Sequence, residues 1–338
     1  MVVPPCQHRC LFGCWHGQHL PTMQATQQNI WFALITLVFT GLYQWAAPLP
    51  AWVDIAFLSS CLLFTGIPHG AIDHVIFAQR HRAQPFSLIR QFFLPYLLLI
   101  AATALCWILV PNLMFWVFLG IAAYHFGQSQ LYYLPPGKAG FPRGLLYMLW
   151  GVFLLSWLWT SHWESQIANL QSLFTWDLAI NQPLHQTIIV LRWISVSLVA
   201  LVIAVLCIQR KISVAAAITE LIVLAILVYM VRNLPLYTAF ALYFGLWHAT
   251  RVMCTEYSYL RNARQAPFTV RQFLQQFIPF SVLSIIGLII LVIAGSFWNI
   301  RVSPFMLFLI FISALTTPHV WVMEHMYGHL SKPAPSNS

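Results

Sequence analysis

Four histidines lie inside long apolar stretches of this sequence, and their side chains can bind a metal ion. They are His69 in TGIPHGAIDH, His125 in AYHFGQSQ, His248 in YFGLWHATR and His319 in TTPHVWVMEH. An ionisable side chain inside an apolar helix is costly to bury, so it marks a candidate functional site. Neutral imidazole is a common protein ligand for iron, zinc and copper. We therefore predict that these four residues hold one metal ion.

Two acidic residues accompany these histidines, although the chain has only 7 Asp and Glu residues in all. Asp73 follows His69 by one helical turn, and Glu324 follows His319. Carboxylates often accept a hydrogen bond from the outer nitrogen of a metal-bound imidazole. We predict this supporting role for Asp73 and Glu324. His74 and His325 are close enough in the sequence to compete for the ligand positions.

The composition requires that a membrane surround these residues. Of the 338 residues, 7% are charged and 60% are hydrophobic, whereas a soluble domain carries about 25% charged residues. This excludes a soluble globular enzyme, and the high hydrophobicity excludes a disordered chain. The net charge of +9 comes from 16 Lys and Arg residues, which stand in short clusters between apolar runs. That pattern is typical of loops that flank membrane spans and does not indicate a nucleic-acid partner.

The sequence predicts an all-α, polytopic membrane helix bundle of about ten transmembrane helices, because each span needs about 20 apolar residues. The expected spans are 29–47, 51–75, 92–110, 113–134, 144–160, 187–208, 212–231, 234–256, 277–297 and 304–327. We expect residues 1–28 to form a short polar N-terminal segment, which holds Cys6, Cys10 and Cys14. Residues 29–330 are predicted to form a single multi-pass transmembrane catalytic domain, and residues 331–338 a tail. Met23 is an alternative start of the chain.

The distribution of basic residues predicts the orientation of the spans. With both termini in the cytoplasm, the outer segments contain Arg232 and Arg301, and nearly all other Lys and Arg residues fall in cytoplasmic segments, as the positive-inside rule requires. Every even-numbered span then runs inward. The four histidines lie in even-numbered spans, each in the inner half. We therefore expect their imidazoles to meet at one depth, toward the cytoplasmic side.

The histidine motifs resemble those of the Brp/Blh family of membrane β-carotene 15,15′-dioxygenases. The matching segments are GIPHGAID at 66–73, YHFG at 124–127, YFGLWHATR at 243–251 and TTPHVWVME at 316–324. The resemblance extends over roughly residues 50–330. It implies a multi-pass protein of the cell membrane that uses Fe(II) and O₂ to cleave a lipophilic carotenoid at its central double bond, giving retinal.

The resemblance also implies roles for individual residues. It assigns His69, His125 and His248 as iron ligands, and His319 belongs to a further family motif and is the candidate fourth ligand. The sequence departs from the family pattern in two places. Val252 stands where the family commonly has a second histidine after His248. Gln128, Ser129 and Gln130 stand in the stretch where an acid often follows H-F-G.

Other functions remain as alternatives at the level of the sequence. A membrane transporter or channel with a His–acid relay would spread polar residues through the full depth of the membrane. A non-catalytic relative that binds a carotenoid or retinal is a second alternative, because of Val252. A di-metal desaturase needs dense histidine boxes, and here an H-x-x-x-H element stands alone at His325–His329. A b-type haem protein needs histidine pairs at two depths, which the predicted single level does not provide.

Overall fold

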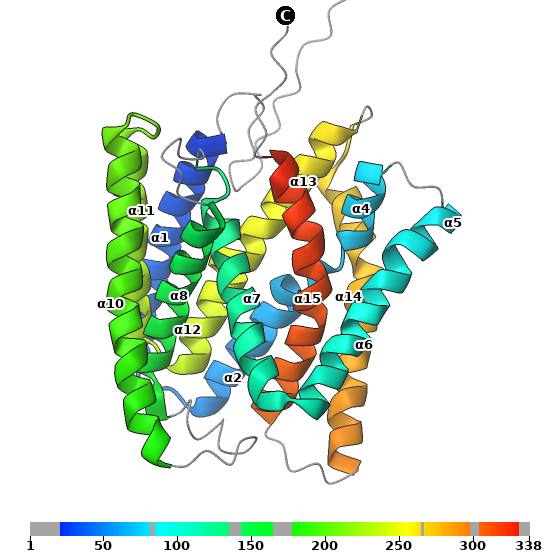
Figure 1. Ribbon diagram of the computed structural model, residues 1–338, viewed down its shortest axis with the longest axis horizontal. Coiled ribbons are helices and arrows are strands. Elements are labelled where there is room, and N and C mark those ends of the chain that lie inside the picture. Colours follow the sequence, from blue (N-terminus) through cyan, green and yellow to red (C-terminus); the bar gives the residue numbers. More distant parts are fainter. Residues whose placement is uncertain are drawn as a thin grey trace, which may run out of the picture.

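The computed structural model describes residues 21–81, 85–134, 143–164, 178–264, 267–297 and 304–330. Within these ranges the regular elements are all helices, and most run nearly parallel or antiparallel to one long axis (Figure 1). This confirms the prediction of an all-α polytopic bundle. The cysteine-containing segment before residue 21 and the tail 331–338 lie outside the described residues.

Most passes through the bundle are single helices, and two are segmented. The single passes are α1 (Pro21–Ala46), α6 (Leu94–Leu109) with the preceding turn η2 (Ile89–Phe93), α7 (Pro111–Leu131), α8 (Arg143–Ser161), α10 (Leu178–Ile208), α11 (Val214–Asn233), α14 (Val270–Phe297) and α15 (Pro304–Leu330). The first segmented pass joins α2 (Ala51–Cys61), η1 (Leu62–Gly66), α3 (Ile67–Gly70) and α4 (Asp73–His81). The second joins α12 (Leu236–Leu242), η3 (Tyr243–Thr250) and α13 (Arg251–Ala263). A short helix, α5 (Pro85–Leu88), precedes η2.

Among the described residues, 8 helices are long and apolar enough to cross a membrane. Each of them coincides with a span expected from the sequence. The remaining two expected spans, 113–134 and 234–256, are also helical, as α7 and as the pass from α12 to α13. These two passes are less apolar than the other 8 because they carry polar side chains that the bundle buries. The buried polar residues include His125, Gln128 and Gln130 on α7, and His248 and Arg251 on the other pass.

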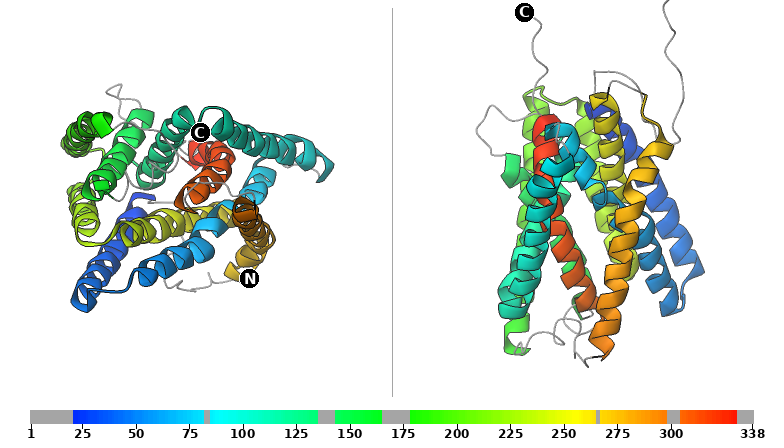
Figure 2. Two further views of the ribbon diagram at one scale, coloured as in Figure 1. Left: turned by 90° about the horizontal axis from the view of Figure 1, so that it is seen from below. Right: turned by 90° about the vertical axis from the view of Figure 1, so that its right-hand side faces the viewer.

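Two connections of the bundle carry basic residues at the same end. Figures 1 and 2 show that α1 begins and α15 finishes at the same end, where the α10–α11 and α13–α14 connections also lie. These connections carry Arg210, Lys211, Arg261 and Arg264. Arg232, in the last turn of α11, lies at the opposite end. The arrangement agrees with the predicted charge asymmetry; the cytoplasmic location of that end remains a prediction.

Helices α7 and α8 pack in direct backbone contact. A Cβ atom on Gly127 would lie 1.9 Å from the carbonyl oxygen of Tyr147, and a Cβ on Gly151 would lie 1.8 Å from that of Ala123. Only glycine permits such an approach, and small residues at helix crossings are typical of membrane bundles. Because Gly127 is two residues after His125, this contact fixes the depth and rotation of the helix that carries His125.

The buried apolar side chains form two clusters; His69 and His248 lie between them along the chain, and His125 lies within the larger one. Phe244 and Trp247 of the larger cluster precede His248. In the smaller cluster, Ile72 follows His69 and Met323 follows His319 by about one turn. Apolar side chains of both clusters therefore flank the buried histidines, which limits the access of bulk water to them.

Candidate metal centre

The four histidines named from the sequence meet in the bundle interior. The ring centroids are 4.8 Å apart for His69 and His319, and 5.2 Å apart for His69 and His248. His125 lies 4.8 Å from His248 and 5.0 Å from His319. One nitrogen from each of His69, His125 and His319 lies within 4.8 Å of the others. All four rings are buried, so four separate helical passes bring their imidazoles into one cluster.

Local helix irregularities precede or contain three of these residues. His248 lies within the π-helix η3, and the π-helix η1 finishes three residues before His69. Pro68 and Pro318 directly precede His69 and His319, and proline cannot donate the regular backbone hydrogen bond. π-helical turns are rare and occur frequently at functional sites. These irregularities change the helix register at the point where each imidazole turns into the bundle.

Two of the rings donate from Nδ1 to strong outer acceptors. The Nδ1 atom of His69 donates to the backbone carbonyl of Gly66. The Nδ1 atom of His319 lies 2.9 Å from Oδ1 and 3.1 Å from Oδ2 of Asp73. A carbonyl can only accept, and an ionised carboxylate likewise. The proton of each neutral ring is therefore on Nδ1, and the lone pair is on Nε2.

The rings of His248 and His125 also donate from Nδ1. The Nδ1 atom of His248 lies 3.0 Å from Oγ of Ser129, whose own proton is given to the Phe126 carbonyl at 3.0 Å. Ser129 therefore accepts from His248. The Nδ1 atom of His125 lies 3.5 Å from Oε1 of Gln128, a long contact in which the amide oxygen accepts.

Because the outer contacts use Nδ1, Nε2 is the nitrogen of each ring that is left to bind a metal ion. Among the described residues, the buried Nε2 atoms of His125 and His319 have no hydrogen-bond partner. A buried acceptor without a partner is unfavourable, and a cation among these atoms removes the deficit. Outer hydrogen bonds of this kind orient metal-bound histidines and raise their basicity. The donor set fits a metal that prefers imidazole, such as iron, zinc or copper.

The structure changes the partners predicted for the two acids. Asp73 supports His319 on α15 and does not contact its sequence neighbour His69, because it begins α4 beyond a break in the helix and faces α15. It also accepts from the Tyr96 hydroxyl at 2.9 Å. Glu324 contacts no histidine of the cluster: it is exposed and accepts from Gln128 at 2.6 Å. Its link to His125 runs through the Gln128 amide.

Sequence reasoning missed three of the outer acceptors. The Gly66 carbonyl carries no side-chain signal at all. Gln128 and Ser129 depart from the family pattern, and that pattern gives them no role as partners of the ligands. The spacing of three residues between His125 and Gln128 could have indicated this contact, because residues three apart on a helix share a face. No spacing could pair Ser129 with His248, which lies on another helix.

The competing histidines lie elsewhere. The ring of His74 packs on Phe280 with centroids 4.5 Å apart. His325 is exposed, and its Nδ1 atom donates to the Trp321 carbonyl at 2.7 Å. Val252, one turn after His248, is fully buried in the smaller apolar cluster. Neither His74 nor His325 joins the four clustered rings.

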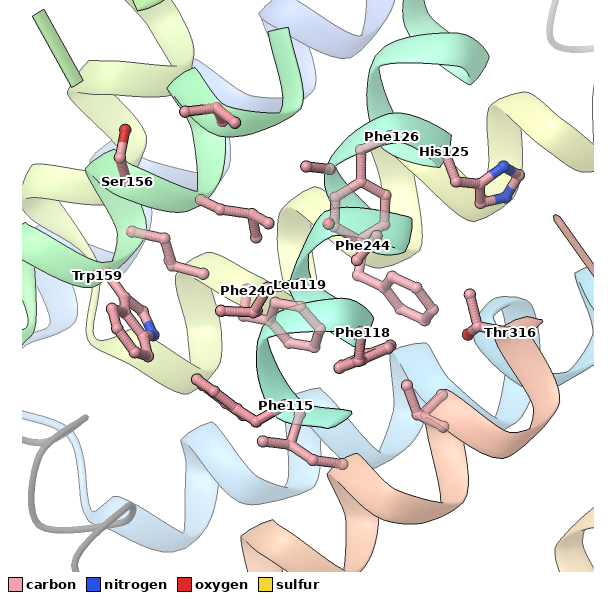
Figure 3. A pocket seen from close by; sticks show the side chains of 18 of the residues that line it. Phe115, Phe118, Leu119, His125, Phe126, Ser156, Trp159, Phe240, Phe244 and Thr316 are labelled. Carbon is pink, nitrogen blue, oxygen red and sulfur yellow. The ribbon is translucent and has the colours of Figure 1, made fainter. Parts of the chain in front are cut away.

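An elongated aromatic cavity, here cavity 1, leads away from the histidines. It has a volume of about 290 Å³, and His69, His125 and His248 line it. Figure 3 shows His125 at one side and Trp159 at the other, with the rings of Phe115, Phe240 and Phe244 between them. Apolar walls of this kind suit a water-insoluble ligand.

A second cavity, here cavity 2, reaches the cluster from another direction. Its volume is about 350 Å³, and it lies among α3, α4, α6, α14 and α15. His69 and Thr316 line both cavities, so the histidine cluster lies at their junction. Leu97 and Leu283 also line cavity 2 and are 59% and 62% exposed. Cavity 2 therefore opens at the side of the bundle, where a lipid-dissolved molecule has access.

Together these features define a polytopic helical membrane protein in which a buried histidine cluster joins two apolar cavities. The family model described as "Beta-carotene 15,15'-dioxygenase" matches residues 60–327. The chain belongs to this family, which confirms the resemblance seen in the histidine motifs. The matched range includes all four clustered histidines. Comparisons with curated proteins and with solved structures found no match.

Proposed function

We propose that this protein is an iron-dependent dioxygenase of the cell membrane that cleaves β-carotene, or a related carotenoid, at the central 15,15′ double bond to give retinal. One observation carries the proposal: four imidazoles whose Nδ1 atoms face outer acceptors form a buried cluster that borders two apolar cavities, and nitrogens of His69, His125 and His319 lie within 4.8 Å of one another. Membership of the dioxygenase family supports the reaction type.

The proposed reaction is balanced by its two reactants. The double bond between the two central carbons and the bond of O₂ both break, and two carbonyl bonds form. Each aldehyde product keeps one oxygen atom, so no external reductant or net proton is needed. Fe(II), when bound, supplies the binding and activation of O₂. Imidazole ligands are neutral and leave the positive charge of the ion intact.

The protein's own residues perform the remaining tasks. His69, His125, His248 and His319 would hold the ion through Nε2, with their tautomers set by the outer acceptors. The aromatic walls of cavity 1 bind and align a flat polyene by apolar contact. The apolar clusters that flank the histidines limit the access of water. The opening of cavity 2 toward lipid admits a substrate that does not dissolve in water.

The direct test is expression in cells that accumulate β-carotene. The wild-type protein is expected to bleach the cells with formation of retinal. His69→Ala, His125→Ala, His248→Ala and His319→Ala are each expected to abolish both retinal formation and iron retention by the purified protein. His325→Ala is the matched control, because this histidine is exposed and lies outside the cluster. Wild-type iron content in all four cluster variants would refute the metal assignment.

The same experiment separates the proposal from its nearest alternative. A non-catalytic carotenoid- or retinal-binding relative would retain the cavities and bind β-carotene without producing an aldehyde. The departure at Val252 is the observation that favours this alternative, since no histidine stands one turn after His248. Retinal formation by iron-loaded protein in the presence of O₂ excludes it.

A further inference from the structure

One hydroxyl group lies at the junction of the two cavities. Cavity 1 and cavity 2 have three lining residues in common, which are His69, Ile312 and Thr316. Thr316 precedes His319 by three residues on α15, so the two side chains lie on one face of that helix. Figure 3 shows Thr316 at the same side of cavity 1 as His125. The Thr316 hydroxyl therefore lies beside the proposed iron site, where the two apolar cavities meet.

The Thr316 hydroxyl is free to donate a hydrogen bond. Other helical threonines of this protein donate to a carbonyl of the preceding turn, as Thr317 does to Ser313 at 2.9 Å and Thr65 does to Cys61 at 2.7 Å. The hydroxyl of Thr316 has no such bond and no other partner within the described part of the chain. A hydroxyl that faces an apolar cavity without a partner is unfavourable. A ligand that accepts its proton would remove this deficit.

The histidines beside the junction do not supply such a donor. The Nδ1 atoms of His69 and His319 donate outward, to a backbone carbonyl and to a carboxylate, and their Nε2 atoms carry lone pairs. The side chain of Ile312 has no polar group. Of the residues that line both cavities, only Thr316 can therefore donate a hydrogen bond into them. The ligand that fits this group is an apolar molecule with one acceptor, such as a carbonyl oxygen.

We propose that the junction of the cavities is a binding site for a lipophilic aldehyde, and that the Thr316 hydroxyl donates a hydrogen bond to the carbonyl oxygen. The inference rests on the proposed function, because cleavage leaves each new carbonyl oxygen on a former central carbon, next to the histidines. The polyene half of the aldehyde then lies in one cavity and its oxygen at the junction. The contact is not covalent, so the protein binds retinal as a ligand whether retinal is formed in the site or supplied from the lipid.

The size of the effect follows from the loss of one hydrogen bond, which changes Kd by about fivefold. Retinal should therefore bind about fivefold more tightly than axerophthene, the hydrocarbon with the same ring and polyene but without the oxygen atom. Thr316→Val keeps the shape of the side chain and should remove this preference, whereas Thr316→Ser keeps the hydroxyl and should retain it. Thr317→Val is the matched control, because the Thr317 hydroxyl donates to Ser313 and Thr317 is not among the residues lining either cavity.

The test uses the full-length protein in lipid nanodiscs, loaded with Fe(II) and kept without O₂. Quenching of tryptophan fluorescence gives the affinities for retinal and axerophthene. Resonance Raman spectroscopy of bound retinal reports the contact directly, because a hydrogen bond to the carbonyl oxygen lowers the C=O stretching frequency. We expect a lowered frequency in the wild-type protein, in Thr316→Ser and in Thr317→Val. Thr316→Val should show the frequency of retinal dissolved in lipid.

The outcomes separate the aldehyde site from the proposed reaction. An unshifted carbonyl band in the wild-type protein, equal wild-type affinities for the two probes, or a shift that persists in Thr316→Val overturns the aldehyde site, even where cells that express the protein form retinal. A lowered frequency that depends on Thr316 supports the site, even where those cells form no retinal, which rejects the reaction alone. The two wild-type measurements decide the proposal if a variant does not fold.

Discussion

The carboxylate of Asp73 offers a sharp test of how the proposed iron site is held. In the substitution Asp73→Asn the shape of the side chain is kept and its charge is lost. The Nδ1–H group of His319, now 2.9 Å from a carboxylate oxygen, would face a neutral amide. Loss of such an outer partner lowers metal affinity by about 10–100-fold, equivalent to about 1.4–2.7 kcal/mol. We expect Asp73→Asn to lose iron in this range while the protein remains folded.

The assay is competition for Fe(II) between the purified protein and a chelator of known affinity, with the thermal unfolding temperature as a measure of folding. Tyr96→Phe is the control, because it removes a second hydrogen bond to Asp73 at 2.9 Å and leaves the carboxylate on His319. It should weaken iron binding by no more than about fivefold, the contribution of one hydrogen bond. Wild-type iron affinity in Asp73→Asn, or equal losses in the two variants, would refute the reasoning.

Three further predictions concern other parts of the site. Ser129→Ala removes the acceptor for His248 at 3.0 Å, so iron affinity should fall by about tenfold, and an unchanged affinity in the chelator assay would count against that contact. Gly127→Ala places a methyl group 1.9 Å from the Tyr147 carbonyl oxygen, so the unfolding temperature should drop by several degrees; an unchanged value would show that α7 and α8 are not in backbone contact. Val252→His puts a larger polar ring into a fully buried apolar position. We expect the free energy of unfolding to fall by about 1–3 kcal/mol, measured by denaturant unfolding. Metal analysis should show no gain in iron content.

The sequence was sufficient to predict the helical class and most of the spans, because a bilayer imposes a length and a hydropathy on each helix. The basic residues that flank the spans predict a common depth for the four histidines, and the four rings do form one cluster. Two passes were less apolar than the rest, since they bury polar side chains such as His125 and His248. In those passes the polar residues that weaken the membrane signal belong to the site itself.

The supporting contacts of the site could not be predicted, because they depend on the rotation of one helix against another. Asp73 stands one turn after His69 in the sequence, yet it supports His319 across the bundle. Glu324 follows His319 and instead reaches Gln128 on α7. The π-helical turn that contains His248 has no reliable sequence signature, and it alters which residues share a face with that imidazole.

The central claim is that imidazoles from separate helices hold a single iron ion. X-ray absorption at the iron edge, on full-length protein purified and reconstituted with Fe(II) without O₂, tests it most directly. The account predicts one iron per chain, with nitrogen neighbours and the outer-ring scattering of three or four imidazoles, which His125→Ala should reduce or abolish. An iron environment without imidazole scattering, or a wild-type spectrum and iron content in His125→Ala, would contradict it.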